Sequence, residues 1–491
     1  MGLTMTVEVM AVGSSLLATD GYKLSMAEAG WPLRKETFYF SFRRGGAQVV
    51  PFDVEAMVRS LLPEARDEDY VYLADNEYAM GTGFKAAIAK KDIVVRGAPK
   101  GAWVLPHEPF VTVTGPSALM SWLEPLMLQM HYRIQVATLA LRDPDALARA
   151  VRVVTCDAQR DVVWEALDAV GVPVPEIRVD AAPYAARVRE RAAELVAAAG
   201  DGSRIFEVGL RAASSVEQHL VALEACKSAG ITRTSHVLGA KRLGMVPVGT
   251  MGHEHVQRYG SDEAAFRAMK ERRPHRSSFL LDTFDTVRSG LPAALEIIAE
   301  DPEGHDSIRY DSGDKEAQYL VAVKMARDLG VRPIHVLEDG FDAEQLRHFE
   351  GLRERCGVRM DEQFYGFGGW LVSQTEGSGL TRDRVAAVYK LSQTGKRPVM
   401  KFSDDAGKVS VPGVPVVWRR MRGSGPMGII AQEDERVQGG YARLDTQSDG
   451  NDYKVLPEEE TVELSEATRA LAVAAKRLAF AAFGEKGGAS C

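Results

Sequence analysis

The sequence has few cysteines, and their spacing matches no metal-binding or disulfide pattern. Its 491 residues include only four, which lie far apart and form no C-x-x-C pair: Cys156, Cys226, Cys356 and Cys491. Structural zinc sites and the disulfide frameworks of small secreted domains both rely on closely spaced cysteines, so this distribution argues against both. We therefore expect a protein of the reducing cytoplasm.

Long apolar runs and an excess of positive charge are also absent. The most apolar long stretch, residues 118–134, contains Glu124, Pro125, Gln129 and His131, so it predicts a buried helix and not a membrane span. The formal net charge of −8 disfavours nucleic acid or an anionic membrane as the main partner. No basic segment followed by an apolar core opens the chain, so we expect no secretion signal.

The sequence does contain enough apolar residues for a large core and more chain than one ordinary domain needs. Hydrophobic residues make up 45% and charged residues 26%, which is typical of a globular protein. A length of 491 residues indicates two or three domains. We predict domains at 1–150, 151–395 and 396–491.

The middle of the sequence alternates strand-like and helix-like segments. Six short apolar runs start 26 to 40 residues apart, with helical patterns between them. A βα repeat of this length is typical of a parallel barrel or a doubly wound sheet. The predicted strands are 205–210, 245–250, 278–282, 307–311, 333–338 and 363–366.

The two flanking regions have different patterns. After about residue 395 the chain is rich in Gly, Pro and Asp, and it ends in an amphipathic helical pattern near 465–483, which predicts a small β-rich appendix with a terminal helix. Before residue 150 the pattern is α+β. There, β-rich segments at 37–43, 93–96, 103–105 and 110–114 alternate with helical patterns at 53–62 and 117–141.

Polar residues follow every one of the six predicted strands. In a parallel barrel the carboxyl ends of the strands face one rim, so these side chains are expected to share one cavity. Glycines there let backbone N–H groups approach a phosphate, carboxylates suit ribose hydroxyls or Mg²⁺, and arginine matches phosphate oxygens. The set comprises Glu207, Arg211, Thr250, His253, Glu254, Asp282, Asp285, Arg309, Asp311, Glu338, Asp339 and the glycine run 366–369.

Each member of this set also has a structural interpretation. A single aspartate caps a helix as readily as it binds a substrate, and the glycine run forms a tight turn in many proteins. His253 alone suits a structural hydrogen bond, and Arg309 with Asp311 suits an internal ion pair. The recurrence at six strand ends favours a site, because structural ion pairs have no reason to gather at strand termini.

Several motifs in the chain resemble the nicotinate phosphoribosyltransferase family and, more distantly, its nicotinamide-using relatives. The resemblance covers nearly the whole chain, and its elements occur in the order of that family. They are Thr19–Met26, Tyr39–Arg44, Lys100–Pro116 with Glu124–Leu126, Glu-x-Gly-x-Arg at 207–211, Thr-Ser-x-Val at 234–237, Gly-Thr-x-x-His-Glu at 249–254, Asp-Ser-Gly-Asp at 311–314, and Pro398–Lys401 with Ser403.

The resemblance implies a fold and an activity. The implied fold is an irregular α/β barrel of the type II phosphoribosyltransferase kind, with an α+β N-terminal domain and a small C-terminal β-rich appendix. The implied reaction joins nicotinate to phosphoribosyl pyrophosphate, giving nicotinate mononucleotide and pyrophosphate for NAD salvage. In the family, ATP is a co-substrate whose hydrolysis is coupled through a phosphohistidine, here at the position of His253, and Mg²⁺ is the cofactor.

The resemblance also implies roles for single residues. Tyr22 is similar to an aromatic residue that stacks on the pyridine ring from a neighbouring subunit, which implies a homodimer with shared active sites. Ser235 stands where nicotinamide-using relatives have an aspartate, so it favours nicotinate over nicotinamide. No residue is assigned as a dedicated metal ligand. The other expected substrate contacts are Arg211 for the pyridine, Arg309 or Arg382 for pyrophosphate, Asp311 and Asp339 for ribose or metal, Gly368 and Gly369 for the 5′-phosphate, and Arg43 and Asp282.

Three departures from the family pattern bear on the choice of base. Val208 replaces a common phenylalanine beneath the pyridine ring, and His236 replaces a common asparagine. The loop at 365–370 resembles the nicotinamide-using branch. A nicotinamide phosphoribosyltransferase and a catalytically inactive nucleotide-binding regulator therefore remain alternatives. A barrel aldolase or isomerase ranks last because no lysine stands at a predicted strand end.

Overall fold

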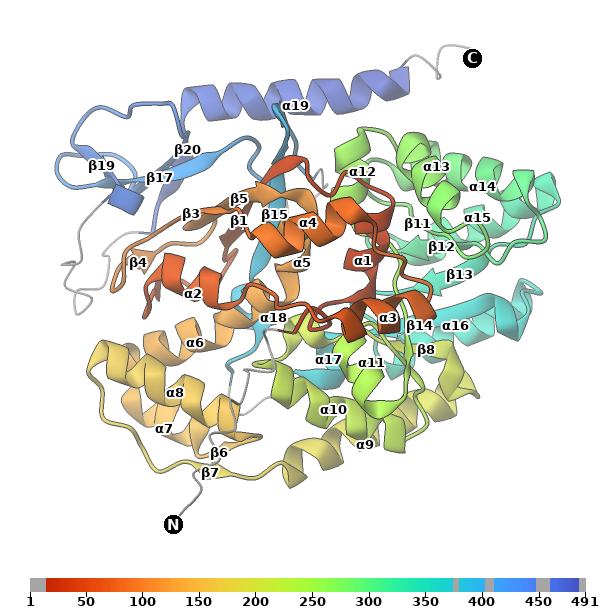
Figure 1. The fold of residues 1–491 in the computed structure, drawn as a ribbon, viewed down its shortest axis with the longest axis horizontal. Coiled ribbons are helices and arrows are strands. Elements are labelled where there is room, and N and C mark those ends of the chain that lie inside the picture. Colours follow the sequence, from red (N-terminus) through yellow and green to blue (C-terminus); the bar gives the residue numbers. More distant parts are fainter. Residues whose placement is uncertain (1–14, 374–378, 402–409, 447–459, 485–491) are drawn as a thin grey trace.

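The computed structural model describes residues 15–373, 379–401, 410–446 and 460–484. Ser403 and Cys491 lie outside these ranges. The described chain forms three main sheets: a five-stranded antiparallel sheet, a seven-stranded parallel sheet and a four-stranded sheet near the C-terminus (Figure 1). None of the described helices combines the length and the hydropathy needed to cross a membrane.

The antiparallel sheet joins segments from both halves of the chain. Its central strand β1 (Lys35–Ser41) pairs with β5 (Val111–Pro116) on one side and with β15 (Val388–Thr394) on the other. All residues of β1 except Lys35 are buried, and Phe38 stacks on Tyr389 of β15 with ring centroids 4.9 Å apart. The edge strands are β3 (Val94–Gly97) and β16 (Arg397–Pro398).

The parallel sheet is a barrel that is open at one seam. Around the sheet the order is β10-β9-β8-β14-β13-β12-β11, so successive strands are adjacent within β8–β10 and within β11–β14, and β8 pairs with β14. Within the described part of the chain, no hydrogen-bonded ladder joins β10 to β11. The α/β barrel predicted from sequence is thus confirmed in an open form. Its strands are β8 (Ile205–Glu207), β9 (Arg233–Thr234), β10 (Val246–Pro247), β11 (Ser278–Leu280), β12 (Ser307–Tyr310), β13 (Ile334–Leu337) and β14 (Gln363–Phe367).

Local sequence signals define the helices that pack around the barrel. Ser215, Ser261, Asp314 and Asp342 each accept a hydrogen bond from a backbone N–H of the first turn that follows, which satisfies a donor that the helix itself leaves free. These helices are α10 (Val216–Ser228), α13 (Asp262–Arg272), α15 (Lys315–Leu329) and α16 (Ala343–Arg355), with α9 (Ala182–Ala199) and α14 (Leu291–Glu300) beside them.

Helix α1 (Gly21–Glu28) connects the first sheet to the barrel, and Figure 1 shows it between the two. Gly21 and Gly249 pack backbone against backbone, and a Cβ built on Gly249 would lie 2.4 Å from the carbonyl carbon of Gly21. Only glycine permits so close an approach. A single antiparallel bridge between Asp20 and His236 fixes the helix start.

The C-terminal sheet comprises β17 (Pro415–Arg420), β18 (Gly428–Gln432), β19 (Tyr441–Arg443) and β20 (Val462–Leu464), followed by α19 (Glu466–Gly484) at the top of Figure 1. It matches the predicted β-rich appendix with its terminal helix. The predicted domain limits at 150 and 395 stay predictions, and β15, just before the second limit, belongs to the first sheet.

The remaining elements are short strands and the helices around them. They are β2 (Gln48–Val49), β4 (Trp103–Val104), β6 (Val153–Val154), β7 (Arg178–Val179), α2 (Val54–Ser60), α3 (Asp67–Asp75), α4 (Thr82–Lys90), α5 (Ser117–Trp122), α6 (Glu124–Arg142), α7 (Pro144–Val151), α8 (Asp157–Val170), α11 (Val237–Leu243), α12 (His253–Tyr259), α17 (Gly369–Val372) and α18 (Arg382–Val385).

Candidate active site

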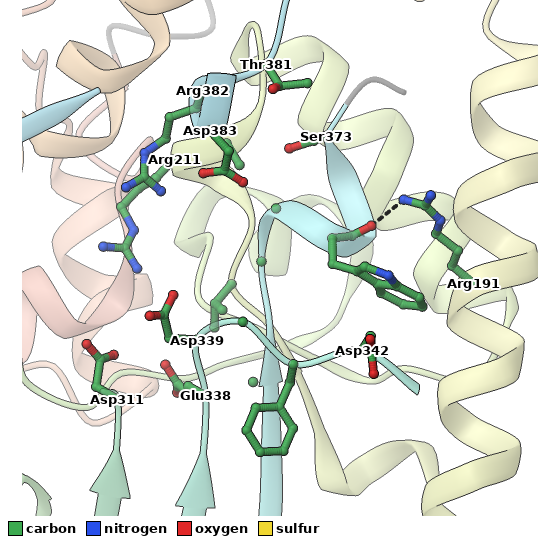
Figure 2. A pocket seen from close by; sticks show the side chains of 18 of the residues that line it. Arg191, Arg211, Asp311, Glu338, Asp339, Asp342, Ser373, Thr381, Arg382 and Asp383 are labelled. Atoms are coloured by element: carbon green, nitrogen blue, oxygen red, sulfur yellow. Dashed lines mark hydrogen bonds between the residues drawn. The ribbon is translucent and has the colours of Figure 1, made fainter. Parts of the chain in front are cut away.

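A cavity of about 550 Å³ lies at the carboxyl ends of the barrel strands. Figure 2 shows Asp311, Glu338 and Asp339 at the ends of neighbouring strands, with Arg211 and Arg382 above them. Several strand-end side chains that the sequence predicts to share one cavity thus do line one cavity. Gly368, between β14 and α17, and Gly369, the first residue of α17, also line the cavity.

Arg309 is held firmly by protein oxygen atoms. Its guanidinium donates to Thr250 Oγ1 at 2.7 Å and to Asp311 Oδ1 at 2.6 Å, and its Nε lies 3.2 Å from Glu338 Oε2. Burial disfavours the charged guanidinium, but Glu338 and Asp311 outweigh this effect and raise the pKa of Arg309. Arg309 therefore stays charged and fixes the orientation of Asp311, in addition to lining the cavity.

His253 lies in a cluster of charged side chains at the start of α12. Its Nδ1 is 3.1 Å from Thr283 Oγ1, and its Nε2 is 2.9 Å from Lys401 Nζ and 3.3 Å from Asp311 Oδ2. Burial, and then the Lys401 ammonium, lower the pKa of His253, while Asp282 and Asp311 act in the opposite direction. The imidazole is therefore neutral near pH 7. Because the ammonium can only donate, Nε2 accepts from Lys401 and Nδ1–H faces Thr283.

The same cluster offers a set of ligands for a cation. Ligand atoms of His253, Asp282 and Asp311 all lie within 4.8 Å of one another. Asp282 Oδ1 is buried and has no hydrogen-bond partner in the described structure. Carboxylate oxygens are the ligands that Mg²⁺ prefers. The residues therefore fit a magnesium ion, although the sequence predicted no dedicated ligand.

Arg382 lines the cavity, and cations from several other elements lie near it. The pKa of Lys390, on β15, is lowered to about 7 by burial and by the nearby Lys401, with smaller effects from Arg43 and Arg382. Burial and Arg211 likewise lower the pKa of Arg382. A concentration of positive charge that depresses these pKa values is suited to bind a polyanion, which would relieve the repulsion.

A smaller pocket, of about 20 Å³, adjoins the cavity. The two share Val208, Arg211, Arg309 and Glu338 in their walls, so they lie side by side. The remaining lining residues of the small pocket include Tyr22, Phe206, Ser235 and Thr250.

Arg211 and Tyr22 face each other in the small pocket. The Arg211 guanidinium carbon lies 5.3 Å from the centroid of the Tyr22 ring, and the Tyr22 hydroxyl donates to Glu124 Oε2 at 2.6 Å. This Tyr22 belongs to the same chain as the pocket. The close packing of Gly21 on Gly249 holds α1 against the barrel within this chain, and a site shared between subunits stays a prediction.

Ser235 is bonded to a carboxylate that sequence reasoning did not place here. Its hydroxyl donates to Asp20 Oδ1 at 2.6 Å, and Asp20 Oδ2 lies 3.5 Å from Arg211 Nε. Burial raises the pKa of Asp20, while Arg211 and the Ser235 hydrogen bond counteract it. Asp20 thus offsets part of the positive charge of Arg211 at the pocket wall.

Asp339 holds a strained backbone conformation beside the cavity. It adopts φ 61°, in the left-handed region, and Gly340 follows with φ 69°. Non-glycine residues rarely adopt this conformation, and those that do often stand at functional sites. The tight turn brings the Asp339 carboxylate and Gly340 to the cavity opposite Gly368.

Comparisons with known proteins agree with this geometry. The model of the nicotinate phosphoribosyltransferase family matches residues 203–428, which include the barrel strands and the loops that form both pockets. The barrel part of the chain is thus similar to the nicotinate phosphoribosyltransferase family.

Individual relatives show how similar the chain is in sequence and in fold. A nicotinate phosphoribosyltransferase of Bacillus subtilis is 29% identical over 269 residues, which cover 53% of this chain and only half of that protein. One of Homo sapiens is 24% identical over 480 residues, covering 83% of this chain and 77% of that protein. A solved nicotinate phosphoribosyltransferase from Porphyromonas gingivalis has a similar fold, with a TM-score of 0.55 at 17% identity over 81% of this chain and 95% of that one.

The family motifs account for part of the site and miss another part. Among the predicted site residues, Arg211 and Arg309 line both pockets, and Ser235, Asp311, Asp339, Gly368, Gly369 and Arg382 line one of them. His253 and Asp282 adjoin the cavity through Asp311, whereas Arg43 lines neither pocket and lies near Lys390. Asp20, Phe206 and Lys390 were not predicted, although Asp20 and Phe206 lie inside or beside the quoted motifs. No local signal marks Lys390, because a lysine within an antiparallel strand gives no indication of the cavity it adjoins.

Proposed function

We propose that the protein is a nicotinate phosphoribosyltransferase, which forms nicotinate mononucleotide and pyrophosphate from nicotinate and phosphoribosyl pyrophosphate. The similarity to this family supports this function. The observation that carries it is the adjacency of the two pockets: a pocket lined by aromatic residues and arginine shares a wall with a larger cavity that is lined by carboxylates, glycines and arginines. A flat base and a phosphorylated sugar would occupy adjacent spaces, as the new bond between them requires.

The reaction needs little covalent chemistry from the protein. The ring nitrogen of nicotinate bonds to the anomeric carbon of ribose while the bond from that carbon to the pyrophosphate oxygen breaks. Positive charge develops on the sugar, where Asp311 and Asp339 would stabilise it, and negative charge develops on pyrophosphate, where Arg382 and Lys390 would. Gly368 and Gly369 would leave room for the 5′-phosphate against the backbone.

ATP coupling through His253 is part of the proposal. The neutral Nε2 would take the terminal phosphoryl group of ATP, forming an N–P bond as the O–P bond to ADP breaks. Lys401, which now contacts Nε2, would then neutralise the added charge. Asp282 and Asp311 would hold Mg²⁺, which supplies positive charge to phosphate oxygens.

Nicotinate is the preferred base in this proposal. A carboxylate substrate would pair with the Arg211 guanidinium, while Ser235 adds no charge of its own. Asp20 is the residue that opposes this preference, because its carboxyl group lies 3.5 Å from Arg211 Nε.

A cytoplasmic homodimer completes the proposal. The described cysteines Cys156, Cys226 and Cys356 are free, which suits a reducing compartment. The intrachain contacts of Asp20 and Tyr22 support sites that each chain completes by itself within such a dimer.

Competition between bases tests the function. Purified protein is incubated with phosphoribosyl pyrophosphate, Mg²⁺ and either nicotinate or nicotinamide, with and without ATP, and mononucleotide and pyrophosphate are quantified. We expect a higher kcat/KM for nicotinate and stimulation by ATP. A higher kcat/KM for nicotinamide would establish the alternative transferase. No pyrophosphate with either base would favour the inactive regulator.

A further inference from the structure

Three buried titratable side chains form a chain of hydrogen bonds behind the small pocket. Glu207 Oε1 lies 2.9 Å from His219 Nε2, and His219 Nδ1 lies 2.9 Å from His236 Nδ1. All three side chains are completely buried, and none lines either pocket. The reaction proposed above makes no use of them.

The hydrogen-bond donors and acceptors determine where the protons lie. The Glu207 carboxylate accepts from Gly209 N–H at 2.6 Å, from the Thr234 hydroxyl at 2.7 Å and from His219 Nε2–H. One of the two Nδ1 atoms must donate to the other, and with the His219 tautomer that carries its only proton on Nε2 the donor is His236 Nδ1–H. His236 is neutral because burial, and then His219, place its pKa well below the ordinary value.

This arrangement leaves one buried acceptor without a partner. His236 Nε2 makes no hydrogen bond in the described structure. An unsatisfied buried polar atom costs stability, and well-packed apolar side chains often replace a buried polar group without loss. Stability alone therefore does not account for the chain of three, whereas a requirement for a fixed orientation does.

The chain of three connects the segments that carry the pocket side chains. Glu207 binds Gly209 N–H at the start of the turn to Arg211, and its backbone oxygen accepts from Ser235 N–H at 2.8 Å. Beside Ser235, His236 forms the bridge to Asp20, and Ser235 O accepts from Gly21 N–H at 2.7 Å, directly before Tyr22.

We propose that Glu207, His219 and His236 form a positioning relay that sets the relative placement of Arg211, Ser235 and Tyr22 around the pyridine base. These residues act through the pocket side chains and do not touch the substrate. The inference rests on the proposed function. Because the relay supports only the base pocket, its disruption weakens binding of nicotinate and leaves the phosphoribosyl pyrophosphate site intact.

Two variants interrupt the relay at its second bond. His219→Gln keeps a donor for Glu207 but removes the acceptor for His236, and His236→Leu removes the donor while leaving the bond between Glu207 and His219. For each we expect the KM for nicotinate to rise about fivefold or more, with kcat and the KM for phosphoribosyl pyrophosphate within about twofold of wild type. His236→Asn, whose amide can donate from the position of Nδ1, should keep the KM for nicotinate within about twofold.

A matched control is another buried histidine outside the site. His335 accepts or donates one hydrogen bond at 2.9 Å to the Tyr310 hydroxyl and lines neither pocket. His335→Gln should lower thermal stability without changing the KM for nicotinate. If His219→Gln and His236→Leu transfer phosphoribose with an unchanged KM for nicotinate, or if His335→Gln raises that KM equally, the relay has no positioning role. Absence of any transfer by the wild-type protein would overturn the proposed function, and the relay with it.

Discussion

At the scale of single residues, the small pocket has an aromatic residue at position 206, two residues before position 208, where the family commonly has phenylalanine. Val208 provides no ring, but Phe206 points to the same side of β8 and lines the pocket. Phe364 stacks behind it with centroids 5.4 Å apart and an interplanar angle of 18°, and the Arg233 guanidinium lies 5.7 Å from the Phe206 ring. Phe206 is therefore held rigidly by its neighbours.

This aromatic residue leads to a prediction for Phe206→Leu. If the base packs against Phe206, losing an aromatic contact worth about 0.5–1.5 kcal/mol raises the KM for nicotinate roughly two- to tenfold, with little change in kcat. Steady-state kinetics with varied nicotinate measures this. Phe364→Leu is the control, since Phe364 lines neither pocket, and it should alter the KM far less. Equal effects of both substitutions would contradict a direct contact of the base with Phe206.

A second residue-scale prediction concerns Lys401 and pH. The Lys401 ammonium lowers the pKa of His253, so Lys401→Met raises that pKa. Phosphoryl transfer needs the neutral imidazole, and the acid limb of ATP-stimulated activity should therefore move to higher pH in the variant. The ratio of rates with and without ATP is measured between pH 5 and pH 8. The control is Lys390→Met. Lys390 is not one of the hydrogen-bond partners of His253 described above, so the acid limb should stay in place in this variant. If the acid limb of ATP-stimulated activity does not move in Lys401→Met, the assignment of His253 as the phosphorylated residue is wrong.

At the scale of elements, the sequence pattern predicted the features that depend on nearby residues, such as the ends of helices. Helices α10 and α15 end where the sequence indicates, because Gly230 and Gly330 adopt φ values of 105° and 71° just beyond them. Strand β9 was missed because its two residues, Arg233–Thr234, are too few to show a periodicity. The bond from Ser235 to Asp20 spans 215 residues of sequence and depends on the docking of α1, which no local pattern records.

The start of helix α13 supports a prediction on stability. Burial raises the pKa of Asp262 to about 7, with nearby Asp282 and Asp285 acting in the same direction. Between about pH 4 and pH 7 the folded protein keeps a proton that the unfolded chain has released, so wild-type stability falls as pH rises through this window. Asp262→Asn has no such proton, and its Tm should exceed the wild-type Tm by a margin that grows from pH 5 to pH 8.

Differential scanning calorimetry at both pH values measures that margin. The control is Glu263→Gln, whose ion pair with Arg267 is exposed and contributes little. It should give a small and constant difference in Tm. A margin for Asp262→Asn that shrinks with rising pH would show that Asp262 is ionised in the folded protein.

At the scale of the whole molecule, Tyr22 lines the small pocket of its own chain, so we expect each chain to complete its own site. A mixture of two inactive variants tests this. Tyr22→Leu and His253→Ala are co-expressed with different tags, and the heterodimer is purified. In this heterodimer each chain carries one of the two substitutions, so neither chain has a complete site of its own. We therefore expect ATP-stimulated activity no higher than that of the two homodimers. Sites shared between subunits would instead regenerate one complete site per heterodimer and about half of the wild-type activity.

Strand β1 lies between β5 and β15, and this position has a consequence for the time course of synthesis. Residues 35–41 leave the ribosome early, but one edge of β1 stays unpaired until residues 388–394 have been made. For most of translation, the nascent chain therefore exposes one unpaired edge of β1, whose side chains are mostly buried in the folded protein. An exposed strand edge of this kind promotes aggregation. Nascent chains truncated before β15 should depend on chaperones and carry no catalytic activity, and enzyme activity should appear only after the last third of the chain has joined the first.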